Sequence, residues 1–130
     1  VNVGDLGRAI NPEIVASQLS GAAIMQLGFT MSEKMEFSAG QCVNPSLADY
    51  KIPGIRDIPR GIENEAVDAA QGSGPFGAKG VGESGTFGVS PAIASAIEDA
   101  VGVRITTLPS TAEAVLRALR ERQGRQLAAD

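Results

Sequence analysis

The pattern of apolar and polar residues predicts a long helix near the start of the chain. Asn11 can cap this helix, Pro12 suits its first position, and Glu13 places a negative charge near the positive end of the helix dipole. We expect the helix to run from Pro12 to about Phe29. Its main apolar residues are Ile14, Val15, Leu19, Ala22, Ala23, Met25 and Leu27. Because they are spread widely around the axis, the helix should be largely buried.

Small residues interrupt this helix at Ser17, Ser20, Gly21 and Gly28. Gly21 costs roughly 1 kcal/mol of helix propensity relative to alanine, which favours close packing against another backbone or a ligand. Gln18 lies among these small residues. Its long amide would be unfavourable on a buried face without a hydrogen-bond partner. The amide therefore either bonds a specific group or lies on an exposed stripe, and the pattern favours neither.

Four short strands are predicted by alternation and by the turn residues that follow. Residues 1–6 alternate and end at a glycine, and residues 34–37 alternate before the turn Ala39-Gly40. Residues 61–70 and 103–108 are the other two candidates. Together with the helices, these strands predict an α/β (α+β) fold in which helices pack on a small mixed sheet.

Two further helices follow in the second half of the chain. Ser90 and Pro91 should begin one of them, which ends at Gly102. Its apolar stripe is Ile93, Ala96, Ile97 and Ala100. Ser110 and Glu113 have the spacing of a capping box for the last helix. That helix carries Val115, Leu116 and Leu119.

Residues 44–59 contain three prolines and little periodicity, so we expect an ordered, extended connection. Its apolar anchors would be Leu47, Tyr50, Ile52, Ile55 and Ile58. We assign residues 1–123 to one domain and residues 124–130 to a flexible tail.

The glycine-rich segment 72–88 holds the strongest candidate for chemistry. Within it, Glu83 stands among Gly77, Gly80, Gly82 and Gly85, whose backbones can approach a ligand closely. A carboxylate sheltered in such a loop is suited to act as a general base. The alternative is a mobile surface loop with an ordinary solvated glutamate.

Nucleotide-binding motifs fit this segment poorly. Residues 72–77 and 80–85 both match G-x-G-x-x-G, but a bare match is weak evidence for a dinucleotide-binding turn. The required helix should open within the motif, whereas here it begins only at Ser90. A phosphate-binding P-loop is excluded because Ala78 stands where a lysine is needed.

Composition limits the remaining classes. The chain has 130 residues, 43% of them hydrophobic, and a net charge of −4, which argues against nucleic acid as the main partner. No apolar run approaches the roughly 20 residues of a membrane span, and we expect a cytoplasmic protein. With Cys42 alone and no histidine, the chain can build neither a zinc site nor an iron–sulfur cluster by itself. It opens on Val1 rather than methionine, from which we expect a processed product, a fragment or one part of something longer.

Several segments together closely resemble the C-terminal part of the molybdopterin-binding subunit of the xanthine dehydrogenase and aldehyde oxidase family. In chain order they are Asp5-Leu6-Gly7-Arg8-Ala9-Ile10-Asn11-Pro12, Gln18-Leu19-Ser20-Gly21, Asp49-Tyr50-Lys51-Ile52-Pro53, Asp57-Ile58-Pro59, Gly77-Ala78-Lys79-Gly80-Val81-Gly82-Glu83, Ser90-Pro91-Ala92-Ile93-Ala94 and Asp99-Ala100-Val101-Gly102. The resemblance extends from Asp5 to about Glu113 and keeps the order of the motifs. Each motif alone is weak, but their joint occurrence is hard to obtain by chance.

The resemblance implies specific roles. Glu83 takes the place of the family's catalytic base, and Gln18 matches a glutamine that hydrogen-bonds at the cofactor. The residues that would touch the molybdenum–pterin cofactor are Gln18, Ala78, Lys79, Gly80, Val81 and Gly82. Many members have proline after the glutamate, where this chain has Ser84. A later family glutamine appears one place along as Gln26, so we assign no cofactor contact to it.

The resemblance also implies an oxidoreductase that oxidises an aldehyde or N-heterocycle with water as the oxygen source. Iron–sulfur clusters and FAD would lie on partner subunits or domains, beside the rest of the molybdopterin-binding subunit. We expect this chain alone to be inactive and to bind no molybdenum, and we expect no nucleic acid or membrane partner. A non-catalytic assembly or ligand-binding module with the same fold is the alternative.

Overall fold

The computed structural model of the chain describes residues 1–69 and 74–127. Gly72 and Ser73, with which the glycine-rich segment begins, lie outside the described residues, as do Ala70 and residues 128–130. The elements in chain order are β1 (Asn2–Asp5), α1 (Pro12–Met31), β2 (Phe37–Ser38), β3 (Gln41–Cys42), α2 (Leu47–Tyr50), β4 (Asn64–Val67), the 3₁₀ helix η1 (Pro75–Gly77), α3 (Val89–Val101) and α4 (Ala112–Leu127).

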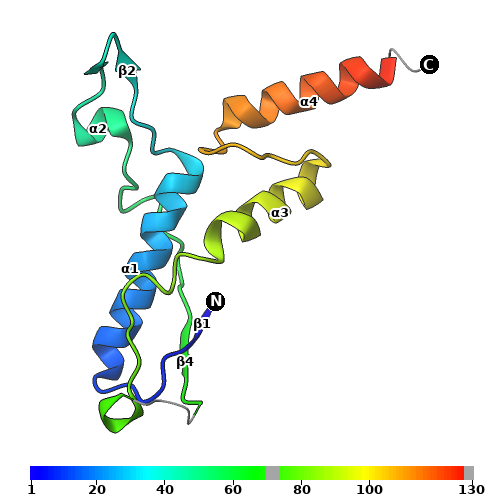
Figure 1. Cartoon of the computed structure of the whole chain (residues 1–130). Helices are drawn as coiled ribbons and strands as arrows, with labels where there is room; N and C mark the ends of the chain where they lie inside the picture. The colour runs from blue at the N-terminus through cyan, green and yellow to red at the C-terminus, as the bar shows by residue number, and fades with distance from the viewer. Residues whose placement is uncertain (70–73, 128–130) are drawn as a thin grey trace.

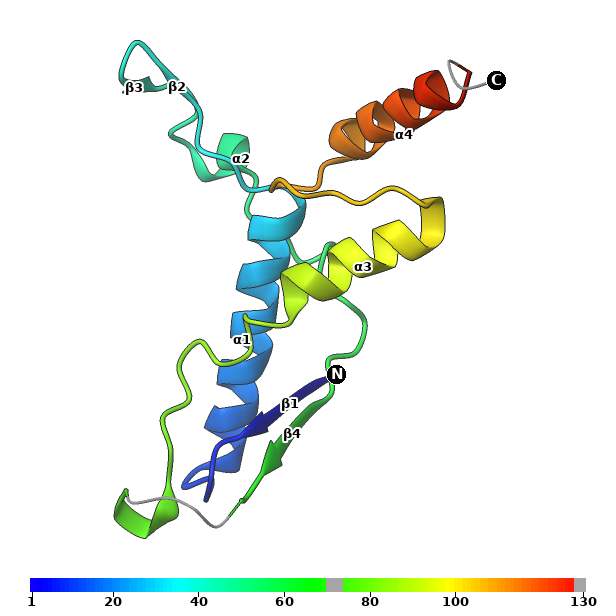
Figure 2. The same ribbon diagram turned by 45° about the vertical axis from the view of Figure 1, so that its right-hand side comes forward.

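The first strand pairs in parallel with β4, and α1 lies against one side of the pair (Figures 1 and 2). The register places Asn2 opposite Asn64. Both asparagines face the helix: the Asn2 amide donates to the Leu19 carbonyl at 3.4 Å, and the Asn64 amide donates to the Ser20 hydroxyl at 2.7 Å. The polar face of this sheet is therefore satisfied by the backbone and small side chains of α1.

The third helix crosses α1 through a polar contact. The Ser90 hydroxyl accepts a hydrogen bond from the Gln26 amide at 2.5 Å and lies 2.7 Å from the Thr30 hydroxyl, which is fully buried. Ser90 does not cap α3, because the helix begins at Val89 with Gly88 at the cap position and no side-chain cap bond. Gly102 ends α3 in the left-handed conformation, as predicted.

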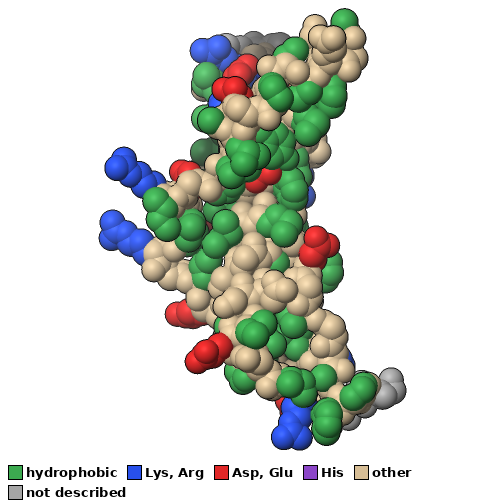
Figure 3. Space-filling view, turned by 90° about the vertical axis from the view of Figure 1, so that its left-hand side faces the viewer, with side chains coloured by type: hydrophobic (Ala, Val, Ile, Leu, Met, Phe, Trp, Pro, Cys, Tyr) green, Lys and Arg blue, Asp and Glu red, His purple; other side chains and the backbone are tan. Residues whose placement is uncertain are grey.

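The hydrophobic core is small. Leu6, Val15 and Leu19 form its centre, with Val81 packed against it. The expectation of a largely buried α1 was wrong for this chain, because only one face of the helix is covered; Ile14 is 60% exposed, and Met25, Phe29 and Met31 are also exposed. Figure 3 shows apolar side chains along the whole length of one face of the molecule.

By length and composition only, α1 is long and apolar enough to cross a membrane. The expectation that no apolar run approaches a membrane span was therefore wrong by that criterion. The core helix of a soluble protein meets the same criterion, and α1 packs against α3, β1 and β4.

The strands form two separate pairs, one parallel and one antiparallel. The antiparallel hairpin of β2 and β3 turns at Ala39-Gly40, as predicted, but its first strand is Phe37–Ser38 instead of residues 34–37. The sequence-based strand at 61–70 shortens to β4. No strand forms at 103–108 within the part of the chain that is described, although Val103 is buried.

The short helix α2 was not predicted. It lies inside the connection 44–59, where the Ser46 hydroxyl accepts a hydrogen bond from the Asp49 amide. The proposed apolar anchors fail in part: Leu47, Ile52 and Ile55 are exposed, whereas Tyr50 and Ile58 are half-buried.

The last helix, α4, stands apart from α1 in both ribbon views (Figures 1 and 2). Its cap is Thr111, whose hydroxyl accepts from the Ala114 amide at 3.2 Å, so the predicted capping box was wrong. Glu113 instead pairs with Arg117, and Ser110 is buried while its amide donates to the Thr30 carbonyl. The helix extends to Leu127, into the first residues of the predicted tail at 124–130; the domain boundary itself stays a prediction.

Candidate functional site

The glycine loop is tied to the end of β1 by a short antiparallel bridge between Gly7 and Ala78. The Lys79 amide donates to the Leu6 carbonyl at 3.0 Å, and the Arg8 amide donates to the Gly77 carbonyl at 3.2 Å. Gly7 has a φ of 57°, and a Cβ atom there would overlap the Gly77 carbonyl oxygen. The bridge therefore requires glycine at position 7 for both its conformation and its close approach.

An ion pair lies beside this bridge. Lys79 Nζ is 2.6 Å from Asp5 Oδ2, and the other carboxylate oxygen of Asp5 accepts a hydrogen bond from the Gly7 amide at 3.3 Å. The Lys79 hydrogen bond is the main reason that the pKa of Asp5 lies below its ordinary value. The side chain of Lys79 is thus directed to β1.

The loop returns to α1 through Val81 and Gly85. Val81 packs against the core cluster of Leu6, Val15 and Leu19. Gly85 is buried, and a Cβ atom there would lie 2.7 Å from the Leu19 carbonyl oxygen. Because the carbonyl belongs to a helix backbone, it cannot move aside, and the loop can make this contact only with glycine.

Between the bridge of Gly7 with Ala78 and the contact of Gly85 with α1, the loop has backbone amides without a partner among the described residues. Among the described residues, the amides of Gly80, Val81 and Gly82 have no hydrogen-bond partner. A Cβ atom at Gly80 or Gly82 would meet nothing within 4 Å. Three successive N–H donors without a partner, with open space at Gly80 and Gly82, can bind an anionic or carbonyl group of a ligand.

Glu83 follows these amides directly. Its carbonyl accepts hydrogen bonds from the Thr86 amide at 3.0 Å and the Thr86 hydroxyl at 2.8 Å, so its backbone is fixed in a turn. Its side chain is exposed. The described residues of this chain therefore do not supply the shelter expected for the carboxylate.

Gln18 lies on the exposed face of α1 rather than on its buried one. Of the two interpretations left open by its pattern, the exposed stripe describes its position in this chain. The helix and the loop nevertheless meet here, because Gly85 packs against Leu19, the residue after Gln18. Gly21 is exposed on the same helix, and a Cβ atom there would meet nothing within 4 Å.

A hollow of about 230 Å³ opens where the loop faces the start of α1. Its lining includes three of the predicted cofactor-contacting residues, Ala78, Lys79 and Val81. It also includes Arg8 and Asn11, which sequence reasoning did not assign to the site. Both lie in the segment 5–12 that carried the resemblance, so their position in that motif was the available signal.

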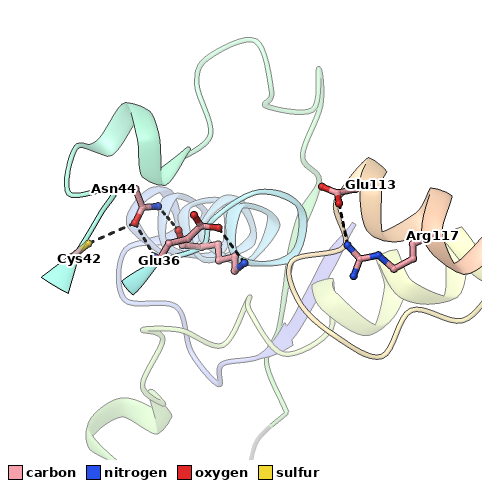
Figure 4. Close-up of polar contacts among 6 residues, drawn as sticks. Glu36, Cys42, Asn44, Glu113 and Arg117 are labelled. Atoms are coloured by element: carbon pink, nitrogen blue, oxygen red, sulfur yellow. Dashed lines mark hydrogen bonds and ion pairs between the residues drawn. The ribbon is translucent and has the colours of Figure 1, made fainter. Parts of the chain in front are cut away.

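The lone cysteine plays no part in this site. Cys42 lies in the β2–β3 hairpin, at the opposite end of α1 from the loop (Figure 1), and its thiol donates to the Asn44 side-chain oxygen at 3.6 Å. Figure 4 shows that Asn44 also joins the backbone of Glu36 and, through its amide, the Lys34 carbonyl. In the part of the chain that is described, no three His, Cys, Asp or Glu side chains are grouped to hold a metal.

Comparison with known proteins gives the same assignment along most of the chain. Residues 1–59 match the family model described as a molybdopterin cofactor-binding domain. The probable hypoxanthine oxidase XdhD of Escherichia coli is 40% identical over 116 residues, which are 88% of this chain and 12% of that protein. A probable xanthine dehydrogenase subunit of Bacillus subtilis is 36% identical over 118 residues, covering 91% of this chain and 16% of that protein.

The solved structures agree. Quinoline 2-oxidoreductase from Pseudomonas putida superposes on 92% of this chain with a TM-score of 0.83 and 33% identity, over 16% of its own length. The chain belongs to the family of molybdenum-binding subunits of xanthine dehydrogenases and aldehyde oxidoreductases. It spans less than a fifth of the length of these relatives.

Family membership confirms the resemblance and the α+β fold class. Among the described residues, the structure shows the strands in two separate pairs, whereas one small mixed sheet was predicted. The roles of Glu83, Gln18 and the residues 78–82 are not tested by the comparisons and stay predictions.

Proposed function

We propose that this chain forms one wall of the molybdenum–pterin cofactor pocket in a molybdenum hydroxylase and supplies its catalytic base. The substrate class is an aldehyde or an N-heterocycle, with water as the oxygen source. The names of the relatives, a hypoxanthine oxidase and a xanthine dehydrogenase, support this class. The observation that carries the proposal is the run of open amides that ends at Glu83 and is anchored on both sides.

The residues of the loop fit such a cofactor. The pterin cofactor is anionic, and the amides of Gly80, Val81 and Gly82 are donors without protein partners among the described residues. The hollow beside Ala78 and Val81 gives room for one edge of a ligand. Lys79 contributes positive charge near this edge, although its side chain is engaged by Asp5. We place Gln18 at the helix side of the same wall.

Glu83 performs the proton transfer in this proposal. When bound, the molybdenum centre would supply the two-electron redox chemistry. The Glu83 carboxylate removes a proton from the attacking water-derived group, and the turn made by Thr86 keeps the backbone of Glu83 in place. The shelter that a base requires comes from the remainder of the subunit, because the side chain is exposed in this chain.

The partners follow from the family, since relatives are named as subunits of such enzymes. We place iron–sulfur clusters and FAD on partner subunits or domains, next to the remainder of the molybdopterin-binding subunit. With one cysteine and no histidine in the sequence, this chain cannot ligate an iron–sulfur cluster by itself. We keep the expectation of a cytoplasmic enzyme with a small-molecule substrate and no nucleic acid or membrane partner.

The test is Glu83→Gln in the complete enzyme with all its subunits. The amide is nearly isosteric but cannot accept the proton, so turnover should fall by about 10²–10⁴-fold. Molybdenum and pterin content, measured by metal analysis and cofactor fluorescence, should equal those of the wild type. Glu65→Gln on β4 is the matched control, because Glu65 is also exposed and lies outside the loop; its turnover should be unchanged.

The alternative is a non-catalytic assembly or ligand-binding module with the same fold. The open amides would serve a bound ligand in either case, so binding alone does not distinguish the two. Full turnover of a cofactor-loaded Glu83→Gln enzyme would leave Glu83 a structural residue and favour the binding module.

A further inference from the structure

We propose that Asp5 is a positioning residue, which fixes the loop carrying the open amides and Glu83 by holding Lys79. The catalytic consequence rests on the proposed function, whereas the structural consequence can be measured without activity. The inference assigns a role to a residue of β1 that lies 74 positions before its partner in sequence.

The two carboxylate oxygens of Asp5 hold the two sides of the bridge. One oxygen takes the ammonium group of Lys79 at 2.6 Å, and the other accepts the amide of Gly7 at 3.3 Å. Gly7 and Ala78 are the paired residues of the bridge itself. A single side chain therefore fixes both strands at the point where the loop begins.

The loop depends on its two ends because its middle is not bonded to the chain. Between the Lys79 amide and the contact of Gly85 with Leu19, the amides of Gly80 to Gly82 have no partner among the described residues. Val81 gives apolar contact to the core, which sets its depth but not its direction. The ion pair of Lys79 with Asp5, at 2.6 Å, ties the start of the loop to β1, and this is a restraint that Val81 does not supply.

The ion pair is better suited to positioning than to global stability. The Asp5 side chain is 45% exposed and that of Lys79 is 32% exposed, and exposed pairs contribute little to folding free energy. Its loss should therefore leave the fold intact and release one end of the loop. A positioning role and a purely structural role thus predict different results.

The experiment compares Asp5→Asn with wild type in the complete, cofactor-loaded enzyme. Asn keeps the size of the side chain and its bond to Gly7 but loses the charge. We expect the Lys79 amide to exchange with deuterium about two- to fivefold faster, which corresponds to about 0.4–1 kcal/mol for an exposed ion pair. We also expect kcat to fall at least fivefold at unchanged KM, cofactor content and melting temperature.

Lys79→Met is a second variant that removes the same pair from the other side. If the two residues act through one contact, the double variant should be no slower than either single variant. Glu36→Gln is the matched control, because it removes an exposed ion pair with Lys34 at 3.1 Å on the hairpin, outside the site. It should change neither the exchange of Lys79 nor kcat.

Unchanged exchange at Lys79 in Asp5→Asn would overturn the proposal. Faster exchange with wild-type kcat, in an enzyme that Glu83→Gln inactivates, would also overturn it, because the loop would then work without the contact. If Glu83→Gln kept full turnover as well, the failure would lie with the proposed function. Faster exchange would in that case still support the contact of Asp5 with Lys79.

Discussion

Replacing Gly7 with alanine should open the bridge that anchors the candidate site. Gly7 has a φ of 57°, which L residues other than glycine adopt at a cost of about 1–2 kcal/mol. The added Cβ would also overlap the carbonyl oxygen of Gly77. That oxygen accepts the Arg8 amide, so the bridge must separate to relieve the overlap.

The expected magnitude combines the two effects. Overpacking against a fixed backbone atom costs about 1–3 kcal/mol, in addition to the conformational cost. The free energy of opening the bridge should therefore fall by about 2–5 kcal/mol. At 1.4 kcal/mol for each factor of ten, the lower value corresponds to about 30-fold faster exchange of the Arg8 and Lys79 amides.

Two other glycines separate these effects. Gly40 also has a positive φ, of 80°, but a Cβ atom there would meet nothing within 4 Å. Gly61 has neither a positive φ nor a close neighbour. Native-state hydrogen exchange on the complete subunit would measure local opening near each site, with the Val43 amide reporting on the hairpin that contains Gly40. Gly61→Ala should have almost no effect, and Gly40→Ala should show the conformational cost alone.

The decisive quantity is the difference between the Gly7 and Gly40 variants. Gly7→Ala should lower the opening free energy of the bridge, and Gly40→Ala should lower that of the hairpin. The decrease should be about 1–3 kcal/mol larger for Gly7→Ala, because only this variant adds a steric overlap. An equal effect in the two variants would show that the bridge tolerates a side chain at Gly7. The account of the loop anchor would then be wrong.

Three further predictions concern separate parts of the chain. Gly21→Leu should leave the fold of this chain intact, because a Cβ atom at Gly21 meets nothing within 4 Å. It should reduce co-purification with the remainder of the enzyme, because the added side chain overpacks a docking contact at a cost of about 1–3 kcal/mol. Unchanged co-purification would contradict this prediction. The pKa of Asp5 lies below its ordinary value of 3.8, so its ion pair with Lys79 should be complete above pH 3.8 and be lost as the pH falls through the lowered pKa. In a carboxyl NMR titration, Lys79→Met should raise the pKa of Asp5. An unchanged pKa would refute Lys79 as the cause of the shift. Thr111→Val should destabilise the start of α4 by about 1 kcal/mol, because it removes the bond from the Ala114 amide. Glu113→Gln should cost less than about 0.5 kcal/mol, because its pair with Arg117 is exposed. Exchange of the Ala114 amide would measure both costs, and a larger cost for Glu113→Gln would restore the capping box.

The sequence predicted the elements whose signals are local. Asn11 and Pro12 set the start of α1 correctly, because the cap acts within one turn, and Gly102 set the end of α3 for the same reason. The start of α4 was misplaced by one residue, since Ser110 and Thr111 are both good caps. Only the packing of Ser110 against Thr30 decides between them.

Prediction was weaker where the outcome depends on distant contacts. Gly28 was grouped with the other small residues of α1, which favour close packing against another backbone or a ligand, but the space beside it is filled by Pro53 and Glu33 of this chain. The partner of Lys79 could not be predicted either, because Asp5 is brought to it only by the pairing of strands far apart in sequence. The predicted burial of α1 was wrong because the described residues cover only one face of the helix, and this chain spans less than a fifth of the length of its relatives.

The parallel pairing of β1 with β4 has a consequence for the order of folding. Asn2 and Asn64 are 62 residues apart, whereas α1, α3 and α4 are held by bonds within each helix. Contacts between distant residues form more slowly than local ones, because the chain between them must first be closed into a loop. The bridge between Gly7 and Ala78 joins residues that are still further apart in the sequence, so it should form no sooner than the strand pair. A newly made chain should therefore have its helices before it has its candidate site, and an intermediate with full helical signal should still lack protection at Lys79.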